Sequence, residues 1–189
     1  MLLMTLLLSM NENYKCRKCV LDIETTTFAP WENGKIICIG IKDVDSGEVL
    51  VFHDENEEAM IIRFFQYFKQ INFQEIIDFN IGFDIRYILI RCLRYKIPAN
   101  SFFAVDSTDL MAILHRFKRL YTFDRPGTLD EWCRCLFGKG KLLNNNSVPA
   151  LYRQGRITEI IRYNKNDLEL THELWKRITF VLNGYNNGN

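Results

Sequence analysis

The stretch VLDIETTTF, residues 20–28, begins like a buried strand and then presents two acidic residues and three threonines. In a strand, side chains alternate between faces, so residues i and i+2 share a face with Cα atoms roughly 6–7 Å apart. Asp22 and Glu24 therefore lie side by side on one face, while Leu21 and Ile23 point to the other. Because two neighbouring carboxylates repel each other, we expect a cation to lie between them.

The composition fits one globular domain. The chain has 189 residues, 48% hydrophobic and 25% charged, which suits a sizeable core and does not fit wholesale disorder. The formal net charge is +1, so nucleic-acid binding would have to come from local basic patches. We expect an N-terminal extension at residues 1–15, one domain at residues 16–182 and a flexible tail at residues 183–189.

The first ten residues, MLLMTLLLSM, are apolar but do not predict a membrane anchor. They are too short to span a bilayer, and they lack the basic region and small-residue cleavage site of a secretory signal. We therefore expect a soluble, cytoplasmic protein with no membrane partner.

Hydrophobic periodicity predicts an α/β fold. The expected strands are Cys19–Glu24, Lys35–Lys42, Glu48–His53, Glu75–Phe79 and Phe102–Val105. The expected helices are Asn56–Ile71, Phe83–Tyr95, a segment capped by Ser107 or Thr108 that runs to about Phe117, a segment opened by the capping box at Thr128, and Ile157–Leu182. The first three strands have short links and predict an antiparallel meander. Helices separate the later strands, which predicts parallel pairing in the same five-stranded sheet.

Four cysteines occur as two close pairs, Cys16 with Cys19 and Cys133 with Cys135. The first pair runs into an apolar strand and the second lies in a helical pattern, so we interpret them as small buried hydrophobic residues. A zinc site and disulfides are the alternatives for these spacings.

Two further acidic residues have contexts that suggest partners for Asp22 and Glu24. Asp84 follows a strand and begins a helix, which places it at the sheet edge where α/β folds bind ligands. Asp167 lies inside the last helix, four residues after Tyr163 and on the same helix face. Four carboxylates meeting at one edge require cations, and two Mg²⁺ or Mn²⁺ ions would make such a cluster a site for phosphodiester cleavage.

These motifs resemble those of the DEDD superfamily of 3′–5′ exonucleases, which have an RNase H-like fold. DIETTT resembles the first motif, NIGFD the second and YNKND the third, in its tyrosine form. The surrounding segments are similar to exonuclease domains related to family B DNA polymerases, over residues 19–178. Those domains usually have one more residue between the asparagine and the aspartate of the second motif.

The resemblance implies a role for each acidic residue. Asp22, Glu24 and Asp167 are expected to hold the ion that carries the attacking water, and Asp22 and Asp84 the ion near the leaving group. Tyr163 is expected to orient that water, because a phenol with a pKa of about 10 is a poor general base.

Substrate contacts are expected next to these motifs. The candidates are Thr25 and Thr26 for the terminal 3′-OH, Asn80 for the terminal nucleotide, and Phe28, Trp31 and Phe83 for base stacking. Each candidate also has a purely structural interpretation: strand threonines, a turn cap and core aromatics. Basic residues of the last third, Lys141 among them, either guide the phosphate backbone or form a solvated face.

The sequence therefore predicts a metal-dependent 3′–5′ exonuclease that releases nucleoside monophosphates from single-stranded 3′ ends. DNA is the first expected substrate, and a polymerase or repair partner is expected. The alternatives are an exoribonuclease, a catalytically inactive nucleic-acid-binding module and an RNase H-like endonuclease.

Overall fold

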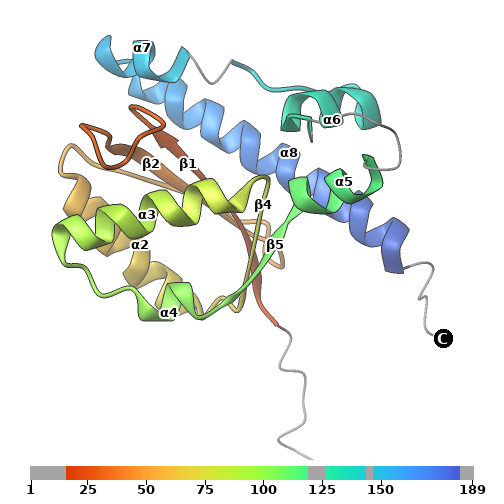
Figure 1. The fold of residues 1–189 in the computed structure, drawn as a ribbon, viewed down its shortest axis with the longest axis horizontal. Helices are drawn as coiled ribbons and strands as arrows, with labels where there is room; N and C mark the ends of the chain where they lie inside the picture. The colour runs from red at the N-terminus through yellow and green to blue at the C-terminus, as the bar shows by residue number, and fades with distance from the viewer. Residues whose placement is uncertain (1–15, 119–126, 144–146, 184–189) are drawn as a thin grey trace, which may run out of the picture.

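The first three strands form the antiparallel meander that the sequence predicts. The computed structural model describes residues 16–118, 127–143 and 147–183. Its sheet contains β1 (Lys18–Thr25), β2 (Ile36–Asp43), β3 (Val49–His53), β4 (Glu75–Asp78) and β5 (Asp106–Asp109) in the order β3-β2-β1-β4-β5 (Figure 1). β1 pairs antiparallel with β2 and parallel with β4, and β5 continues the sheet parallel to β4. The predicted mixed five-stranded α/β sheet is confirmed.

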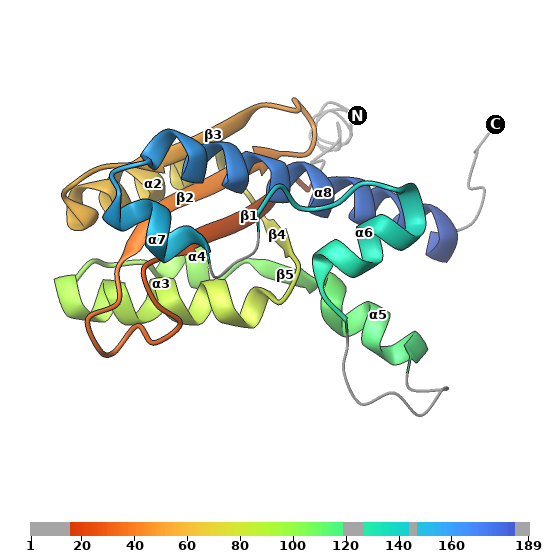
Figure 2. The ribbon, with the colours of Figure 1, turned by 90° about the horizontal axis from the view of Figure 1, so that it is seen from above.

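Helices cover both faces of the sheet. One face packs against α2 (Glu57–Ile71), α3 (Ile81–Tyr95) and the short α4 (Asn100–Phe103). The other packs against α5 (Leu110–Lys118), α6 (Leu129–Phe137), α7 (Val148–Arg153) and α8 (Ile157–Asn183). Figure 2 shows α8 running along the sheet above β1 and β2. The capping box predicted at the start of α6 is present, because Thr128 and Glu131 exchange hydrogen bonds.

The alternation along β1 sorts its side chains between these two layers. Leu21 and Ile23 belong to the core beneath α2 and α3. Val20 belongs to the core beneath α8, so the side chains that share its face point toward α8. The period of two thus places Asp22 and Glu24 on one face of β1, as predicted, and this face is the α8 side of the sheet.

The predicted position of the fifth strand is wrong. The expected segment Phe102–Val105 is apolar, but residues 100–103 form α4, and the strand follows at Asp106–Asp109. Phe102 is 1% exposed and packs edge-to-face against Phe64 and Phe68, so its hydrophobicity reflects the core beneath a helix rather than a strand. β5 is instead a polar edge strand.

The residue that begins α5 also differs from the prediction. Ser107 and Thr108, the expected caps, lie within β5. The Asp109 carboxylate accepts hydrogen bonds from the backbone N–H groups of Met111 and Ala112 and so caps the helix. α7 forms in a stretch for which no element was expected.

The expected extension, residues 1–15, lies outside the described residues, and of the expected tail only Asn183 is described, as the last residue of α8. Cys19 and Cys133 are buried and Cys16 and Cys135 exposed, all as free thiols. Within the described ranges, no helix is both long and apolar enough to cross a membrane.

Candidate active site

Three of the four predicted carboxylates meet where β1 faces α8. Asp22, Glu24 and Asp167 each offer one oxygen, and these oxygens all lie within 4.8 Å of one another. Glu24 is 8% exposed and Asp167 only 1%. Buried carboxylates at such separations repel strongly, and water screens them little. The donor set consists of hard oxygens, which fits Mg²⁺ or Mn²⁺.

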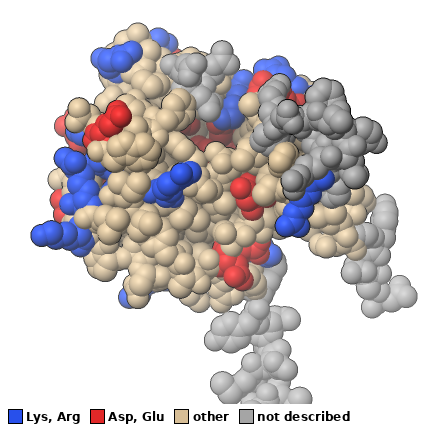
Figure 3. All heavy atoms as spheres, in the orientation of Figure 1, with Lys and Arg blue, Asp and Glu red and all other residues tan. Residues whose placement is uncertain are grey.

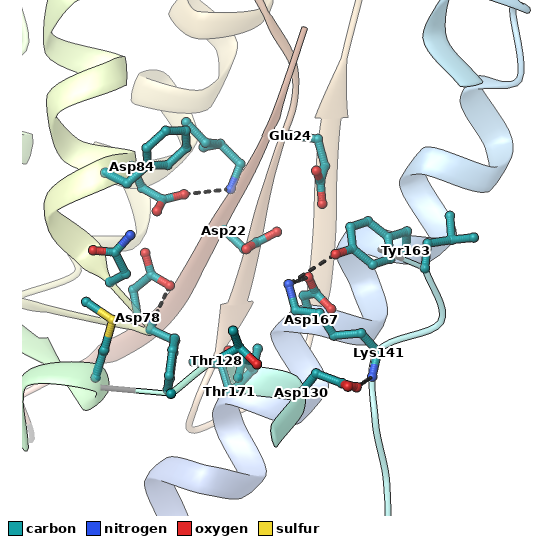
Figure 4. A pocket seen from close by; sticks show the side chains of 18 of the residues that line it. Asp22, Glu24, Asp78, Asp84, Thr128, Asp130, Lys141, Tyr163, Asp167 and Thr171 are labelled. Atoms are coloured by element: carbon teal, nitrogen blue, oxygen red, sulfur yellow. Dashed lines mark hydrogen bonds and ion pairs between the residues drawn. The ribbon is translucent and has the colours of Figure 1, made fainter. Parts of the chain in front are cut away.

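Asp84 approaches the same cavity from the opposite side (Figure 4). Its Oδ1 accepts a hydrogen bond of 2.9 Å from the backbone N–H of Ile23. The pairing of β4 with β1 covers only residues 18–20 of β1, so Ile23 lies beyond that ladder. The first turn of α3 thus supplies the hydrogen bond that β4 does not, and this contact fixes Asp84 next to Asp22.

The cavity between these elements has a volume of about 500 Å³. Its lining includes the four predicted carboxylates, Tyr163, Asp78, Asp130 and Lys141. Figure 3 shows acidic side chains recessed in a hollow on this face of the molecule. On the same face, Lys and Arg side chains lie in separate groups rather than in one continuous patch.

Lys141 provides a positive charge inside the acidic cluster. Its Nζ lies 2.5 Å from Oδ2 of Asp167 and donates a hydrogen bond of 3.1 Å to the Tyr163 hydroxyl. Lys141 lies in the loop after α6, and the first turn of that helix holds it in place, because the Lys141 backbone N–H donates to Oδ1 of Asp130. The sequence offered two interpretations of Lys141, as a guide for the phosphate backbone or as part of a solvated face. Instead, the ammonium group lies in the site and is a counter-ion for its carboxylates.

The burial of these charges shifts their pKa values. Burial raises the pKa of Asp22 well above its ordinary value, Glu24 and Asp167 raise it further, and Lys141 lowers it. The pKa of Glu24 is also raised, by burial and by Asp167. Burial raises the pKa of Asp84 to about 6, even though hydrogen bonds with the Asp78 side chain and from the Ile23 N–H lower it. The site therefore retains protons at pH values where exposed carboxyl groups have lost them.

Tyr163 and Lys141 remain protonated at neutral pH. Burial and the charge of Asp167 raise the pKa of Tyr163, so its phenol is a hydrogen-bond donor rather than a base. Burial lowers the pKa of Lys141, but Asp167 and Asp22 raise it more, and the net shift is upward.

Asn164 is a site residue that the sequence did not reveal. It is fully buried, and its Nδ2 donates to the backbone carbonyl of Asp22 at 3.0 Å and to the Asp22 Oδ2 at 2.6 Å. The contact requires close packing of α8 on β2, because a Cβ atom at Gly40 would lie 2.0 Å from Oδ1 of Asn164. The available signal was its position three residues before Asp167, on the same helix face.

Four of the six candidates for substrate contacts divide into two pairs. Asn80 and Phe83 line the cavity, and the Phe83 ring packs edge-to-face against Phe28 at a centroid distance of 6.0 Å. Thr25 and Thr26 make hydrogen bonds within the β1–β2 loop. The Thr25 hydroxyl donates to the carbonyl of Thr27, and the Thr26 hydroxyl accepts from the N–H of Lys35. These hydrogen bonds of Thr25 and Thr26 stabilise the loop, and a role of the two residues in substrate binding stays a prediction.

The sequence of this chain is similar to those of known proteins. Residues 26–187 match the family model of predicted 3′–5′ exonucleases related to the exonuclease domain of PolB. The chain belongs to this family. It is also 31% identical over 170 residues to an uncharacterized protein of Methanocaldococcus jannaschii, a match covering 84% of this chain and 93% of that protein. The range matched by the family model contains Asp84, Tyr163 and Asp167, whereas Asp22 and Glu24 precede it.

The fold is similar to part of a solved polymerase. The family B DNA polymerase of the hyperthermophilic archaeon Pyrobaculum calidifontis superposes with a TM-score of 0.73 at 18% sequence identity. The superposition covers 88% of this chain and 25% of the polymerase, so the chain spans about a quarter of that protein's length.

Proposed function

We propose that this PolB-related exonuclease is a metal-dependent enzyme that hydrolyses phosphodiester bonds at the 3′ end of single-stranded DNA and releases nucleoside monophosphates. The observation that carries the proposal is the convergence of Asp22, Glu24, Asp84 and Asp167 on one cavity, from three separate elements. A binding module that does not cleave nucleic acid has no use for buried, mutually repelling carboxylates.

The arrangement divides the carboxylates into two overlapping groups. Asp22, Glu24 and Asp167 would hold one divalent ion, and Asp22 and Asp84 a second. Two Mg²⁺ or Mn²⁺ ions bound there would supply a more acidic attacking water and would stabilise the negative charge that develops during hydrolysis.

The remaining residues position the reactants. The Tyr163 phenol donates a hydrogen bond and so orients the attacking water rather than taking its proton. The rings of Phe83 and Phe28, the latter 66% exposed, lie where they can stack on the terminal base. Asn80 lies at the start of α3, on the cavity side, and would steady the terminal nucleotide. A repair or proofreading role beside a polymerase is the setting that we propose for this activity.

The test is incubation with single-stranded DNA and RNA of one sequence, labelled at the 5′ end, with Mg²⁺, Mn²⁺ or EDTA. We expect a ladder of DNA products that shorten from the 3′ end with either metal and none with EDTA. A faster ladder with RNA would reassign the substrate to RNA. Internal cuts would indicate an endonuclease. If both polymers stayed intact with every metal, the proposed nuclease activity would be contradicted.

A Tyr163→Phe variant is expected to hydrolyse DNA up to about 100-fold more slowly, because a misplaced attacking water costs rate rather than metal affinity. Its Mn²⁺ affinity should stay close to that of the wild type. Single-turnover rates and Mn²⁺ titrations measure the two quantities. Tyr152→Phe is the matched control, since it removes a hydroxyl group from α7 outside the cavity lining. An unchanged rate for Tyr163→Phe would remove the tyrosine from the mechanism.

A further inference from the structure

A fifth carboxylate, Asp78, lines the same cavity and has no role in the motifs. It is the last residue of β4 and lies two positions before Asn80. Its side chain is only 2% exposed, and it faces the cavity beside Asp84 and Asp22 (Figure 4). The strand end thus brings an additional negative charge to the side of the cavity opposite α8.

Only one oxygen of the Asp78 carboxylate accepts a hydrogen bond. Oδ1 accepts the backbone N–H of Phe79, whereas Oδ2 is buried and accepts no hydrogen bond from any residue of the described ranges. Burying a carboxylate oxygen without a hydrogen-bond or metal partner costs folding free energy. Because the Asp78 carboxyl group also shares a side-chain hydrogen bond with that of Asp84, this pair needs either a shared proton or a bound cation, and a cation would complete the buried Oδ2.

The charges near Asp78 show what kind of cation this is. Burial raises the pKa of Asp78, and the charges of Asp84 and Asp22 raise it further. The counter-ion Lys141 is paired with Asp167 on the α8 side of the cavity, away from Asp78 and Asp84. Carboxylates from β4, α3 and β1 thus meet around a space that favours a cation with hard oxygen ligands.

We propose that Asp78 is a fifth metal-holding carboxylate, which binds a divalent ion together with Asp84 and Asp22. The inference rests on the proposed function and deepens it, since it assigns a third carboxylate to the ion expected near the leaving group. It also accounts for the buried Oδ2, which becomes a ligand atom directly or through a bound water.

The test is to count the Mn²⁺ ions that the protein binds and to measure the affinity of each, by calorimetry and electron paramagnetic resonance. The wild type is expected to bind two ions. Asp78→Asn should keep the ion held by Asp22, Glu24 and Asp167 and weaken the other by roughly 10- to 100-fold, the range typical for lost supporting groups at metal sites. Asp106→Asn is the matched control, because it removes an exposed carboxylate from the neighbouring strand β5.

The outcomes separate this inference from the proposed function. If the wild type binds two ions and Asp78→Asn binds both equally well, Asp78 is structural and only the inference fails. If the wild type binds no Mn²⁺, the proposed function fails as well. Asp78→Ser serves as a second variant if Asp78→Asn does not fold, because the serine hydroxyl can still accept the Phe79 N–H. Thermal unfolding in EDTA checks the fold of both variants.

Discussion

An Asp22→Asn variant is expected to lose 3′–5′ exonuclease activity by at least about 1,000-fold, since metal ions contribute several kcal/mol of charge stabilisation and each 1.36 kcal/mol is a factor of ten. Asp22 is the carboxylate that both proposed ion sites share. An asparagine amide keeps the size of the side chain but carries no negative charge. Single-turnover hydrolysis of labelled single-stranded DNA measures the loss, and Asp106→Asn is the control that keeps wild-type rates.

The same variant should remain folded and even gain stability when metal is removed. Asp22 is repelled by Glu24 and Asp167, so a neutral residue at position 22 relieves that repulsion. The expected result is therefore an inactive protein whose unfolding temperature in EDTA equals or exceeds that of the wild type. If Asp22→Asn retained more than about a tenth of the wild-type rate, a change of only ~1.4 kcal/mol, the reaction would take place elsewhere on the molecule.

The chelated wild-type protein is expected to lose stability as the pH rises from about 4 to about 7. Asp84 has a pKa of about 6 in the folded protein, above the value of about 3.9 of an unfolded chain. The folded state then binds more protons than the unfolded state, so stability is greatest below the unfolded pKa and falls as the pH passes the folded pKa. For Asp84 alone, the free energy of unfolding falls by about 3 kcal/mol at most over this pH range.

The other site carboxylates add to this effect with the same sign. The pKa values of Asp22, Glu24, Asp78 and Asp167 are also raised, in each case by burial first. Unfolding temperatures across this pH range in EDTA and in excess Mg²⁺ measure the effect. Mg²⁺ binds the ionised carboxylates and should flatten or reverse the slope. Identical slopes in EDTA and Mg²⁺ would mean that these carboxylates hold no metal.

Much of the site could be predicted because each acidic residue has a local signal. The period of two in β1 assigns Asp22 and Glu24 to one face without any knowledge of the fold. The position of Asp84 at a strand-to-helix junction, and the spacing of Tyr163 and Asp167 on one helix, are equally local. Each of these signals needs only a few consecutive residues.

The remainder depends on contacts between distant segments. Lys141 lies in a loop without periodicity, and only tertiary packing brings its ammonium group to Asp167. In the sequence, Asp78 is only a residue near the end of a predicted strand, and the packing of α3 brings Asp84 beside it. The error at β5 has a related cause: Phe102 is apolar because of the core it enters, and hydrophobicity alone does not distinguish a strand from a buried helical turn.

Gly40 has a consequence for the choice of ion. The absent side chain at this position lets α8 approach β2 until Asn164 contacts Asp22, and α8 carries Asp167. The width between β1 and α8 would therefore set the separation of the carboxylates that hold the proposed ion. Mg²⁺ requires oxygen distances of about 2.0–2.1 Å and Ca²⁺ about 2.3–2.6 Å, so a narrow width selects the smaller ion. At the proposed site, discrimination by ionic radius would thus depend on a strand residue that offers no ligand of its own.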